Sequence, residues 1–234
     1  MLIKVPMRFS IITPSFRNGQ WLRLCIASVA DQDVDHEHIV QDAGSDDGTL
    51  QWLTTDSRVR AFVEKDRGMY DALNRGFRRA QGDILAWLNC DEQYLPGALT
   101  RVAEYFKRHP ECHMVFGDVI MVDPNGRYLW HRKMQTPLLY HTWTCHLSTL
   151  SCAMFFRRDV LFDRDCFFNP NLRDVGDGEW MVRVLRSGVR MGTLGQFTSV
   201  FTQTGANLSA GANARREAGE LAKSAPGWAR AIKP

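Results

Sequence analysis

The sequence contains no long apolar stretch. Its longest uninterrupted apolar runs, Ile84–Leu88 and Cys152–Phe156, are five residues long, whereas a helix that crosses a bilayer needs about 20. The first residues, Met1–Arg8, include no apolar core of the kind that a signal peptide has. The sequence therefore predicts neither a membrane span nor export, and it favours a cytoplasmic protein.

The chain also has little charge of one sign and no closely spaced cysteine pairs. Its 29 Lys and Arg residues against 26 Asp and Glu residues give a net charge of +3, and no Lys/Arg block is longer than a pair. This surplus is too small to predict nucleic-acid binding. The six cysteines include no Cys-x-x-Cys pair, so we expect reduced thiols rather than a disulfide framework.

What the sequence does have is the composition of a core-forming domain. Hydrophobic residues make up 44% of the 234 residues and charged residues 24%, as is usual for globular chains. Neither an internal repeat nor a low-complexity linker divides the chain. We therefore expect one domain over residues 1–234, with a regular first half at about 1–120, a more irregular part at about 121–204, and a tail at 205–234 that is a candidate for mobility.

Strand and helix patterns alternate along the first 110 residues. Short apolar runs predict strands, and apolar residues at helical spacing predict the helices between them. The predicted strands are Phe9–Thr13, His38–Gln41, Val59–Val63 and Asp83–Leu88, and the predicted helices begin near Trp21, Thr49, Met69 and Ala98. This alternation predicts an α/β fold with a Rossmann-like, mostly parallel central sheet and helices on both faces.

Polar loops follow the four predicted strands. They are Pro14–Asn18, Asp42–Asp47, Glu64–Gly68 and Asn89–Glu92. In open parallel sheets, ligands bind beyond the carboxyl ends of the strands. The four loops therefore predict a binding cleft at one edge of the sheet.

Asp42 stands at the end of a predicted strand and begins the turn Asp42–Gly48. Its carboxylate is well placed to accept hydrogen bonds from a nucleotide base or ribose. The alternative is a purely structural strand–helix turn, in which Ser45 or Asp46 caps the helix that follows.

The segment Asn89–Glu92 places two adjacent carboxylates, Asp91 and Glu92, directly after a buried strand. Their mutual repulsion is costly unless a cation or solvent relieves it. A hard divalent ion such as Mg²⁺ or Mn²⁺, bound through one or two carboxylates and substrate phosphates, would do so. The alternative is an exposed acidic turn.

Four segments occur in the order seen in a known family. They are Phe9–Phe16, Asp42–Thr49, Asp66–Gly76 and Leu88–Glu92, and a fifth, Asp177–Gly188, is similar to the family's acidic helix. Together they resemble glycosyltransferase family 2, the large family of inverting transferases that use nucleotide sugars and have the GT-A fold. The resemblance implies a nucleotide-sugar-binding half at about 1–120 and an acceptor half at about 121–204.

The resemblance places the donor site in the loops that follow the strands. Thr13, Pro14 and Ser15 would line the base pocket with Arg17 nearby, and Asp42 would contact the base. The other residues that it assigns to the nucleotide sugar are Asp66, Arg67, Gly68, Asp71, Asn74, Arg75 and Asn89. Of these, Arg67 and Arg75 are the natural cations for a diphosphate. Uracil is the favoured base, with guanine and thymine left open.

The resemblance also implies a metal and a general base. Asp91 would hold Mn²⁺ or Mg²⁺ against the donor diphosphate, while Asn89 stands where many members have a further Asp. Asp177 would deprotonate the acceptor hydroxyl. Without the resemblance, Asp177 is the N-cap of the helix that contains Trp180, and the two roles are compatible.

The chain departs from the family pattern near its end. The segment Phe201–Ser209 has no His where many members have one that helps to hold metal or diphosphate, and Gly205–Ser209 has one glycine fewer than the family's Gly-Gly-x-Ser loop. The third metal ligand is therefore left open. The Gln-x-x-Arg-Trp motif of processive synthases is absent, so we expect a single addition rather than polymer synthesis.

The expected protein is a transferase that moves one sugar from a nucleoside diphosphate sugar to a saccharide or lipid-linked saccharide. Similar bacterial members build surface polysaccharide or glycolipid, so the inner face of the membrane is a candidate location. The arginine pairs Arg78–Arg79, Arg157–Arg158 and Arg215–Arg216 are expected to be solvated, and one of them is a candidate contact for anionic lipid. Two alternatives are a non-catalytic module that binds nucleotide sugars and a sugar nucleotidyltransferase. The second would need a Gly-rich triphosphate loop, which Thr13–Gly19 is not.

Overall fold

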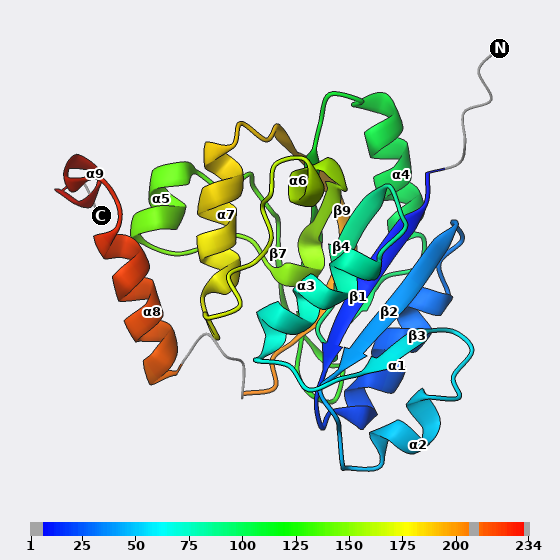
Figure 1. The fold of residues 1–234 in the computed structure, drawn as a ribbon. Helices are drawn as coiled ribbons and strands as arrows, with labels where there is room; N and C mark the ends of the chain where they lie inside the picture. Colours follow the sequence, from blue (N-terminus) through cyan, green and yellow to red (C-terminus); the bar gives the residue numbers. More distant parts are fainter. Residues whose placement is uncertain (1–6, 206–210, 232–234) are drawn as a thin grey trace.

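The structure is a computed structural model that describes residues 7–205 and 211–231 (Figure 1). Within these ranges nine strands join into one sheet. The strands are β1 (Phe9–Ser15), β2 (His36–Asp42), β3 (Arg60–Val63), β4 (Ile84–Trp87), β5 (Glu92–Tyr94), β6 (Met114–Val122), β7 (Tyr128–Arg132), β8 (Met154–Arg157) and β9 (Met191–Thr202). The helices are α1 (Gly19–Ala30), α2 (Thr49–Leu53), α3 (Met69–Arg79), α4 (Ala98–Arg108), α5 (Leu139–Thr144), α6 (Asp159–Phe162), α7 (Gly176–Arg186), α8 (Ala212–Lys223) and α9 (Gly227–Ala231), with a 3₁₀ helix, η1, at Ser151–Ala153.

Six of the strands share one direction. The order along the sheet is β3-β2-β1-β4-β8-β6-β9-β5, and β7 pairs with β6. The strands β1, β2, β3, β4, β6 and β9 run one way, whereas β5, β7 and β8 run the other. The predicted fold class, α/β with a mostly parallel sheet, is confirmed.

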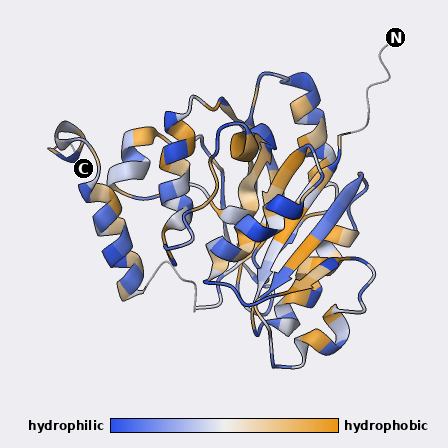
Figure 2. Ribbon diagram, in the orientation of Figure 1, coloured by the Kyte–Doolittle hydropathy of each residue, from blue (hydrophilic) through white to orange (hydrophobic). Residues whose placement is uncertain are grey.

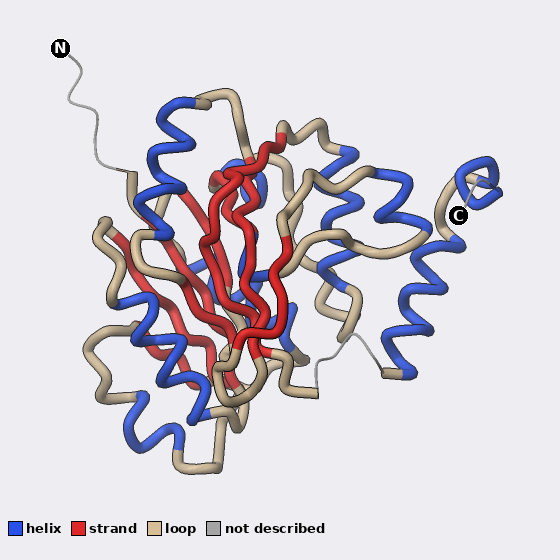
Figure 3. Tube along the Cα trace, turned by 180° about the vertical axis from the view of Figure 1, so that it is seen from behind, coloured by secondary structure: helices blue, strands red, loops and turns tan. Residues whose placement is uncertain are grey.

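Neighbouring residues of β1 meet helices on opposite faces of the sheet, as the alternation of side chains along a strand requires. On one face, Gly76 of α3 lies so close to Ile12 that a Cβ at position 76 would be 2.5 Å from the Ile12 side chain. On the other face, Thr13 Oγ1 lies 3.5 Å from Cys25 Sγ of α1. Figures 1 and 3, seen from the front and from behind, show α3 on one face and α1 and α4 on the other.

The core is centred on β4. Its four residues are buried because β1 and β8 flank the strand and helices cover it. Trp87 lies among four aromatic rings, those of Phe77, Phe156, Phe168 and Trp180, with centroid distances between 5.4 and 6.4 Å. Figure 2 shows apolar residues gathered on the strands. Each fully buried Phe contributes about 1.5–3 kcal/mol, so this cluster fixes the end of β4, from which Asn89 and Asp91 emerge.

Part of the tail that was a candidate for mobility is folded. Residues 211–231 include α8 and α9, which lie against α5. Trp143 Nε1–H donates to Ser224 Oγ at 2.9 Å, and the rings of Tyr140 and Trp228 are 4.4 Å apart. Residues 206–210, which include most of the loop that departs from the family pattern, lie outside the described residues.

None of the helices in the described ranges has both the length and the apolar character needed to cross a membrane.

His38 makes the folded state sensitive to acid. The ring is buried in the sheet, where Nε2 lies 2.9 Å from Thr13 Oγ1, and burial lowers the pKa of His38 to about 3. The unfolded chain binds a proton near pH 6.5 and the folded chain does not, so this contribution to stability is complete above about pH 6.5 and is lost as the pH falls towards 3. We expect unfolding by urea at pH 5 and pH 7 to differ by about 2 kcal/mol from this group alone.

The control is a comparison of two substitutions. His38→Gln should reduce the loss of unfolding free energy between pH 7 and pH 5 by about 2 kcal/mol. His131→Gln, at an exposed position, should leave this loss as in the wild type. Equal slopes for the wild type and His38→Gln would contradict the assignment.

Candidate active site

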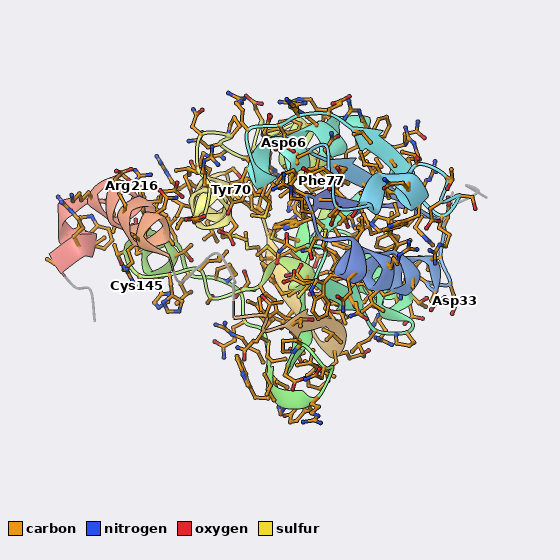
Figure 4. The ribbon with its side chains drawn as sticks, turned by 90° about the horizontal axis from the view of Figure 1, so that it is seen from below. Asp33, Asp66, Tyr70, Phe77, Cys145 and Arg216 are labelled. Carbon is orange, nitrogen blue, oxygen red and sulfur yellow. The ribbon has the colours of Figure 1, made fainter. Side chains whose placement is uncertain are left out.

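A cleft of about 1070 Å³ opens where β1 to β4 end. Its lining combines the loops that follow these strands with Thr149–Ser151, Arg173, Asp174 and Asp177 from the second half of the chain. Figure 4 views the molecule from below, the side on which the strands end, and labels two cleft residues, Asp66 and Tyr70. The prediction that the four polar loops meet at one edge of the sheet is confirmed.

The structure brings most of the predicted site residues to this cleft, but not all. Those that line it are Pro14, Ser15, Arg17, Asp66, Arg67, Gly68, Asn89, Asp91 and Asp177. Those that do not are Thr13, Asp42, Asp71, Asn74 and Arg75.

Arg17 joins two of the loops that form the wall of the cleft. Its guanidinium donates two hydrogen bonds of 2.6 Å to the Asp46 carboxylate, and these bonds raise the pKa of Arg17. Its backbone N–H donates to Ser45 Oγ at 2.8 Å. The φ angle of Arg17 is 50°, which is uncommon for a residue with a side chain. The contacts with the loop after β2 hold this conformation.

Asp42 is fully buried, and both of its carboxylate oxygens are occupied. Oδ1 accepts from the N–H groups of Gly44 and Ser45 at 2.9 and 2.7 Å. Oδ2 accepts from the hydroxyls of Ser15 and Ser45, both at 2.8 Å. Asp42 therefore organises the turn, and a base could reach it only if one of these bonds opened. Its contact with a base stays a prediction.

Asp71, Asn74 and Arg75 lie on α3 and are bound to other parts of the protein. Arg75 Nη2 donates to Asp71 at 2.9 Å, and Nη1 donates to Glu64 at 3.3 Å. The Asn74 amide donates to the carbonyl of Phe168 and accepts from its N–H, at 2.8 and 2.9 Å. The geometry thus gives these three side chains, like Thr13 inside the sheet, structural partners within the protein. Their contacts with a nucleotide stay predictions.

The loop at Asp66–Gly68 presents charge of both signs to the cleft. Asp66 Oδ1 accepts the Gly68 N–H at 2.9 Å, and burial raises the pKa of Asp66. Gly68 has a φ of 126°, a conformation that side chains rarely adopt. Lys65 and Arg67 are exposed at this loop and line the cleft. They are suitable cations for a diphosphate.

The two adjacent carboxylates at the end of β4 have different environments. Asp91 lines the cleft, and burial raises its pKa. Glu92 is fully buried, where it accepts the Asn89 N–H at 2.8 Å and the Ser151 hydroxyl. Burial raises the pKa of Glu92 to about 8, so at neutral pH it is largely protonated and its repulsion of Asp91 is relieved. The alternative of an exposed acidic turn is therefore wrong.

The residues at Asn89 and Asp91 fit a divalent cation that is bound together with a diphosphate. Asn89 Oδ1 is buried and has no hydrogen-bond partner among the described residues, and Asp91 supplies a carboxylate to the same cleft. Mg²⁺ and Mn²⁺ take oxygen ligands, commonly one or two carboxylates plus phosphates. The described part of the chain holds no group of three or more His, Cys, Asp or Glu side chains placed to bind a metal, so an ion here would need oxygens from the donor.

Asp177 lies in the first turn of α7 and faces the cleft. Its Oδ1 accepts the Tyr70 hydroxyl at 3.3 Å and the Gly178 N–H at 2.8 Å. Burial raises the pKa of Asp177, and these two donors oppose the rise. The N-cap residue of α7 is Val175, not Asp177. A carboxylate with a raised pKa in a cleft is suited to accept a proton.

Several residues that line the cleft were not predicted from the sequence. They are chiefly Lys65, Tyr70, Ser151, Arg173 and Asp174. Arg173 and Asp174 lie only a few positions before Asp177, and that closeness was a usable signal. Ser151 gave no such signal, because only the sheet brings it next to Asn89.

Comparison with known proteins identifies the family. A family model described as "Glycosyl transferase family 2" matches residues 10–166, more than half of the chain. The chain belongs to glycosyltransferase family 2. The PGL/p-HBAD biosynthesis glycosyltransferase Rv2957 of Mycobacterium tuberculosis is 33% identical over 182 residues, which cover 75% of this chain and 68% of that protein. A glycosyltransferase of Nostoc sp. is 26% identical over 139 residues, 57% of this chain and 43% of that protein.

Solved structures show that this family 2 chain has the GT-A fold. S. aureus TarS (residues 1–349), in complex with UDP-GlcNAc, superposes with a TM-score of 0.74 at 20% identity over 92% of this chain. The mannosyltransferase PcManGT from Pyrobaculum calidifontis, in complex with GDP-Man and Mn²⁺, gives a TM-score of 0.59 at 20% identity over 86% of this chain. The family 2 chain spans 64% and 58% of these two solved chains.

Proposed function

We propose that this family 2 chain is an inverting, metal-dependent glycosyltransferase. It would move a single sugar from a nucleoside diphosphate sugar to a hydroxyl acceptor. The observation that carries the proposal is that Asp91 and Asp177, from opposite halves of the chain, line one cleft. Such a displacement requires two carboxylates, one beside the leaving group and one beside the acceptor. Asp91 would be the first and Asp177 the second.

Asp177 would act as the general base. It would take the proton of the acceptor hydroxyl as that oxygen forms a bond to the anomeric carbon. The bond from the anomeric carbon to the diphosphate oxygen would break in the same step, with its electron pair leaving on the diphosphate. One displacement from the opposite face inverts the anomeric carbon. The raised pKa of Asp177 supports this role, because a stronger base removes the proton more readily.

The donor side would be held by Asp91, Asn89, Lys65 and Arg67. The two cations would bind the diphosphate, and Asn89 and Asp91 would hold Mn²⁺ or Mg²⁺ next to it. When bound, such an ion offsets the charge that builds on the leaving diphosphate. Support for a divalent ion comes from the oxygen ligands at this site and from the Mn²⁺ in the PcManGT complex.

The favoured donor is a UDP sugar, and the favoured acceptor is a saccharide or a lipid-linked saccharide. The UDP-GlcNAc complex of TarS supports the first, and the mycobacterial relative named for PGL/p-HBAD biosynthesis supports a role in surface polysaccharide or glycolipid synthesis. We place the reaction in the cytoplasm, at the inner face of the membrane. Arg157 and Arg158 are half-buried and donate to backbone carbonyls, so this pair is not proposed as a lipid contact.

A melting experiment with nucleoside diphosphates tests the donor site. The melting temperature would be measured with UDP, GDP, TDP, CDP and ADP, each with and without Mn²⁺. A ligand at about 100 times its Kd adds roughly 2.7 kcal/mol to the unfolding free energy. We expect the largest shift with UDP plus Mn²⁺, and a smaller one with UDP and EDTA. If no diphosphate shifts the melting temperature under either condition, the proposed function is wrong.

A further inference from the structure

A buried carboxylate from the end of the chain binds the segment that leads to Asp177. Glu217 of α8 is 3% exposed and is not part of the cleft. Its Oε2 accepts the N–H of Asp174 and the N–H of Val175, each at 3.0 Å. The Arg173 N–H is shared between Oε1 at 3.0 Å and Oε2 at 3.3 Å. One side chain thus satisfies three consecutive backbone donors.

These donors precede α7, whose first turn carries Asp177. The N-cap residue Val175 makes no side-chain capping hydrogen bond, and the exposed N–H groups at a helix N-terminus favour a negative charge. Burial alone would raise the pKa of Glu217, but the N–H groups of Asp174 and Arg173 outweigh it and lower the pKa. Glu217 is therefore ionised at neutral pH, and it binds the N–H of the N-cap residue and the two N–H groups that precede it.

Asn213, one turn before Glu217, strengthens the connection. Its Nδ2 donates to Asp174 Oδ2 at 2.9 Å and to Glu217 Oε1 at 3.0 Å. Helix α8 is in turn fixed to α5 through the bond from Trp143 to Ser224. Figure 1 shows α5 and α8 on the same side of α7, and Figure 4, seen from below, labels Arg216 and Cys145 in this same part of the molecule. The segment 173–175 is thus held from outside the cleft by a helix that follows it by some 40 residues.

We propose that Glu217 is a positioning residue for sugar transfer. Glu217 binds the backbone of residues 173–175 from outside the cleft. It thereby positions three side chains that line the cleft, those of Arg173, Asp174 and Asp177. This inference rests on the proposed function, in which Asp177 takes the proton of the acceptor. It gives α8 a role in the reaction although α8 contributes no residue to the cleft.

We call the hydrogen bonds from the backbone of residues 173–175 to the Glu217 carboxylate the clamp. Glu217→Gln disrupts the clamp with almost no change in the shape of the side chain. The amide has one oxygen, and its NH₂ group would face N–H donors in either orientation. In the place of Oε2 it would face the backbone N–H groups of residues 173–175. In the place of Oε1 it would face the backbone N–H of Arg173 and the side-chain amide of Asn213. Since donors repel donors, the segment 173–175 must shift. A displacement of about 1 Å in an active site can cost about 100-fold in rate.

The test compares Glu217→Gln with Glu220→Gln. Glu220 is on the same helix but is exposed, and among the described residues its one ion pair is with Arg216. We expect Glu217→Gln to lower kcat about 10–100-fold, with the melting shift produced by UDP and Mn²⁺ as in the wild type. Glu220→Gln should retain wild-type kcat. Equal kcat for the two variants, or a loss matched by weaker UDP binding, would overturn the proposal.

A second pair of measurements keeps the proposal testable if Glu217→Gln does not fold. Asn213→Ala retains the carboxylate and should lower kcat by a smaller factor, about 3–10-fold, again without weakening UDP binding. Where both variants fold, the double variant should be no slower than Glu217→Gln alone, because both act through one segment. Additive losses would mean that the two residues act independently, and would contradict a shared clamp.

Hydrogen exchange separates this proposal from the proposed function. The amides of residues 173–175 should exchange faster in Glu217→Gln than in the wild type or in Glu220→Gln, whether or not transfer is detected. Unchanged exchange would overturn the clamp and leave the transferase intact. If exchange is faster in Glu217→Gln but the wild type binds no nucleoside diphosphate, the clamp holds the segment 173–175. Its role in sugar transfer would then be overturned.

Discussion

Asp177→Asn is expected to lower kcat by about 10²–10⁴-fold, the contribution usually made by a general base. Asparagine keeps the size of the side chain and an oxygen for the Gly178 N–H and the Tyr70 hydroxyl, but it cannot accept the proton of the acceptor. The fold and the donor site should therefore survive. The measurement is sugar transfer under saturating donor, together with the melting shift produced by UDP and Mn²⁺.

Two comparisons make this result specific. Asp33→Asn changes an exposed carboxylate that does not line the cleft, and it should transfer at the wild-type rate. If Asp177→Asn and Asp33→Asn both retain full activity, Asp177 is not the base. If the wild type itself binds UDP but transfers nothing to any acceptor, the non-catalytic binding module is the better description.

Asp91→Asn is expected to have the second largest effect, a loss of about 10²–10³-fold in kcat, the usual cost of removing one group that stabilises developing charge. The substitution leaves an oxygen in place but removes the only cleft-facing carboxylate of the segment 89–92. The part of the UDP melting shift that depends on Mn²⁺ should also disappear.

The part of that shift that persists in EDTA provides the internal control. It reports contacts to the nucleotide that do not involve a cation, so it should be the same in Asp91→Asn and the wild type. A full Mn²⁺-dependent shift in Asp91→Asn would assign the ion to other residues. The same variant should also keep the wild-type melting temperature without ligand, because Asp91 makes no ion pair in the described part of the chain.

The donor half of the fold could be predicted because its signals are local. Each of β1 to β4 contains a short apolar run and is followed by a polar loop. Helix α3 shows its buried face at helical spacing. The end of β4 illustrates the limit of such reasoning. The sequence shows Asp91 and Glu92 side by side, but only the packing of Ser151 and the strand β9 against Glu92 decides that one carboxylate faces the cleft and the other is buried.

The second half was harder to predict because its elements depend on distant partners. Strand β9 contains Gly192 and Gly195 and has a mixed pattern of burial, so no period of two is visible in it. It forms because β6 pairs along it and β5 covers its other edge. Helix α8 has one apolar residue larger than alanine, Leu221, and its single buried charge, Glu217, looks like a surface residue in the sequence.

The same reason explains the donor residues that lie outside the cleft. The family pattern assigns Asp71, Asn74 and Arg75 to the nucleotide side. These residues lie on α3, which follows the loop that contains Asp66. Arg75 binds Glu64, which precedes the helix. Asn74 binds the backbone of Phe168, which is 94 residues further along the chain. A sequence motif gives the order of side chains but not the competition among their partners.

The pairing of β5 has a consequence for how the protein is made. Glu92, the residue after Asp91, lies opposite Phe201 in the sheet, and in the described residues β9 is the one strand with which β5 pairs. During synthesis the ribosome releases Asp91 about a hundred residues before that partner. The nascent chain must therefore keep its acidic loop without its neighbouring strand until β9 has emerged, and a chain that stops short of β9 would expose Glu92 instead of burying it.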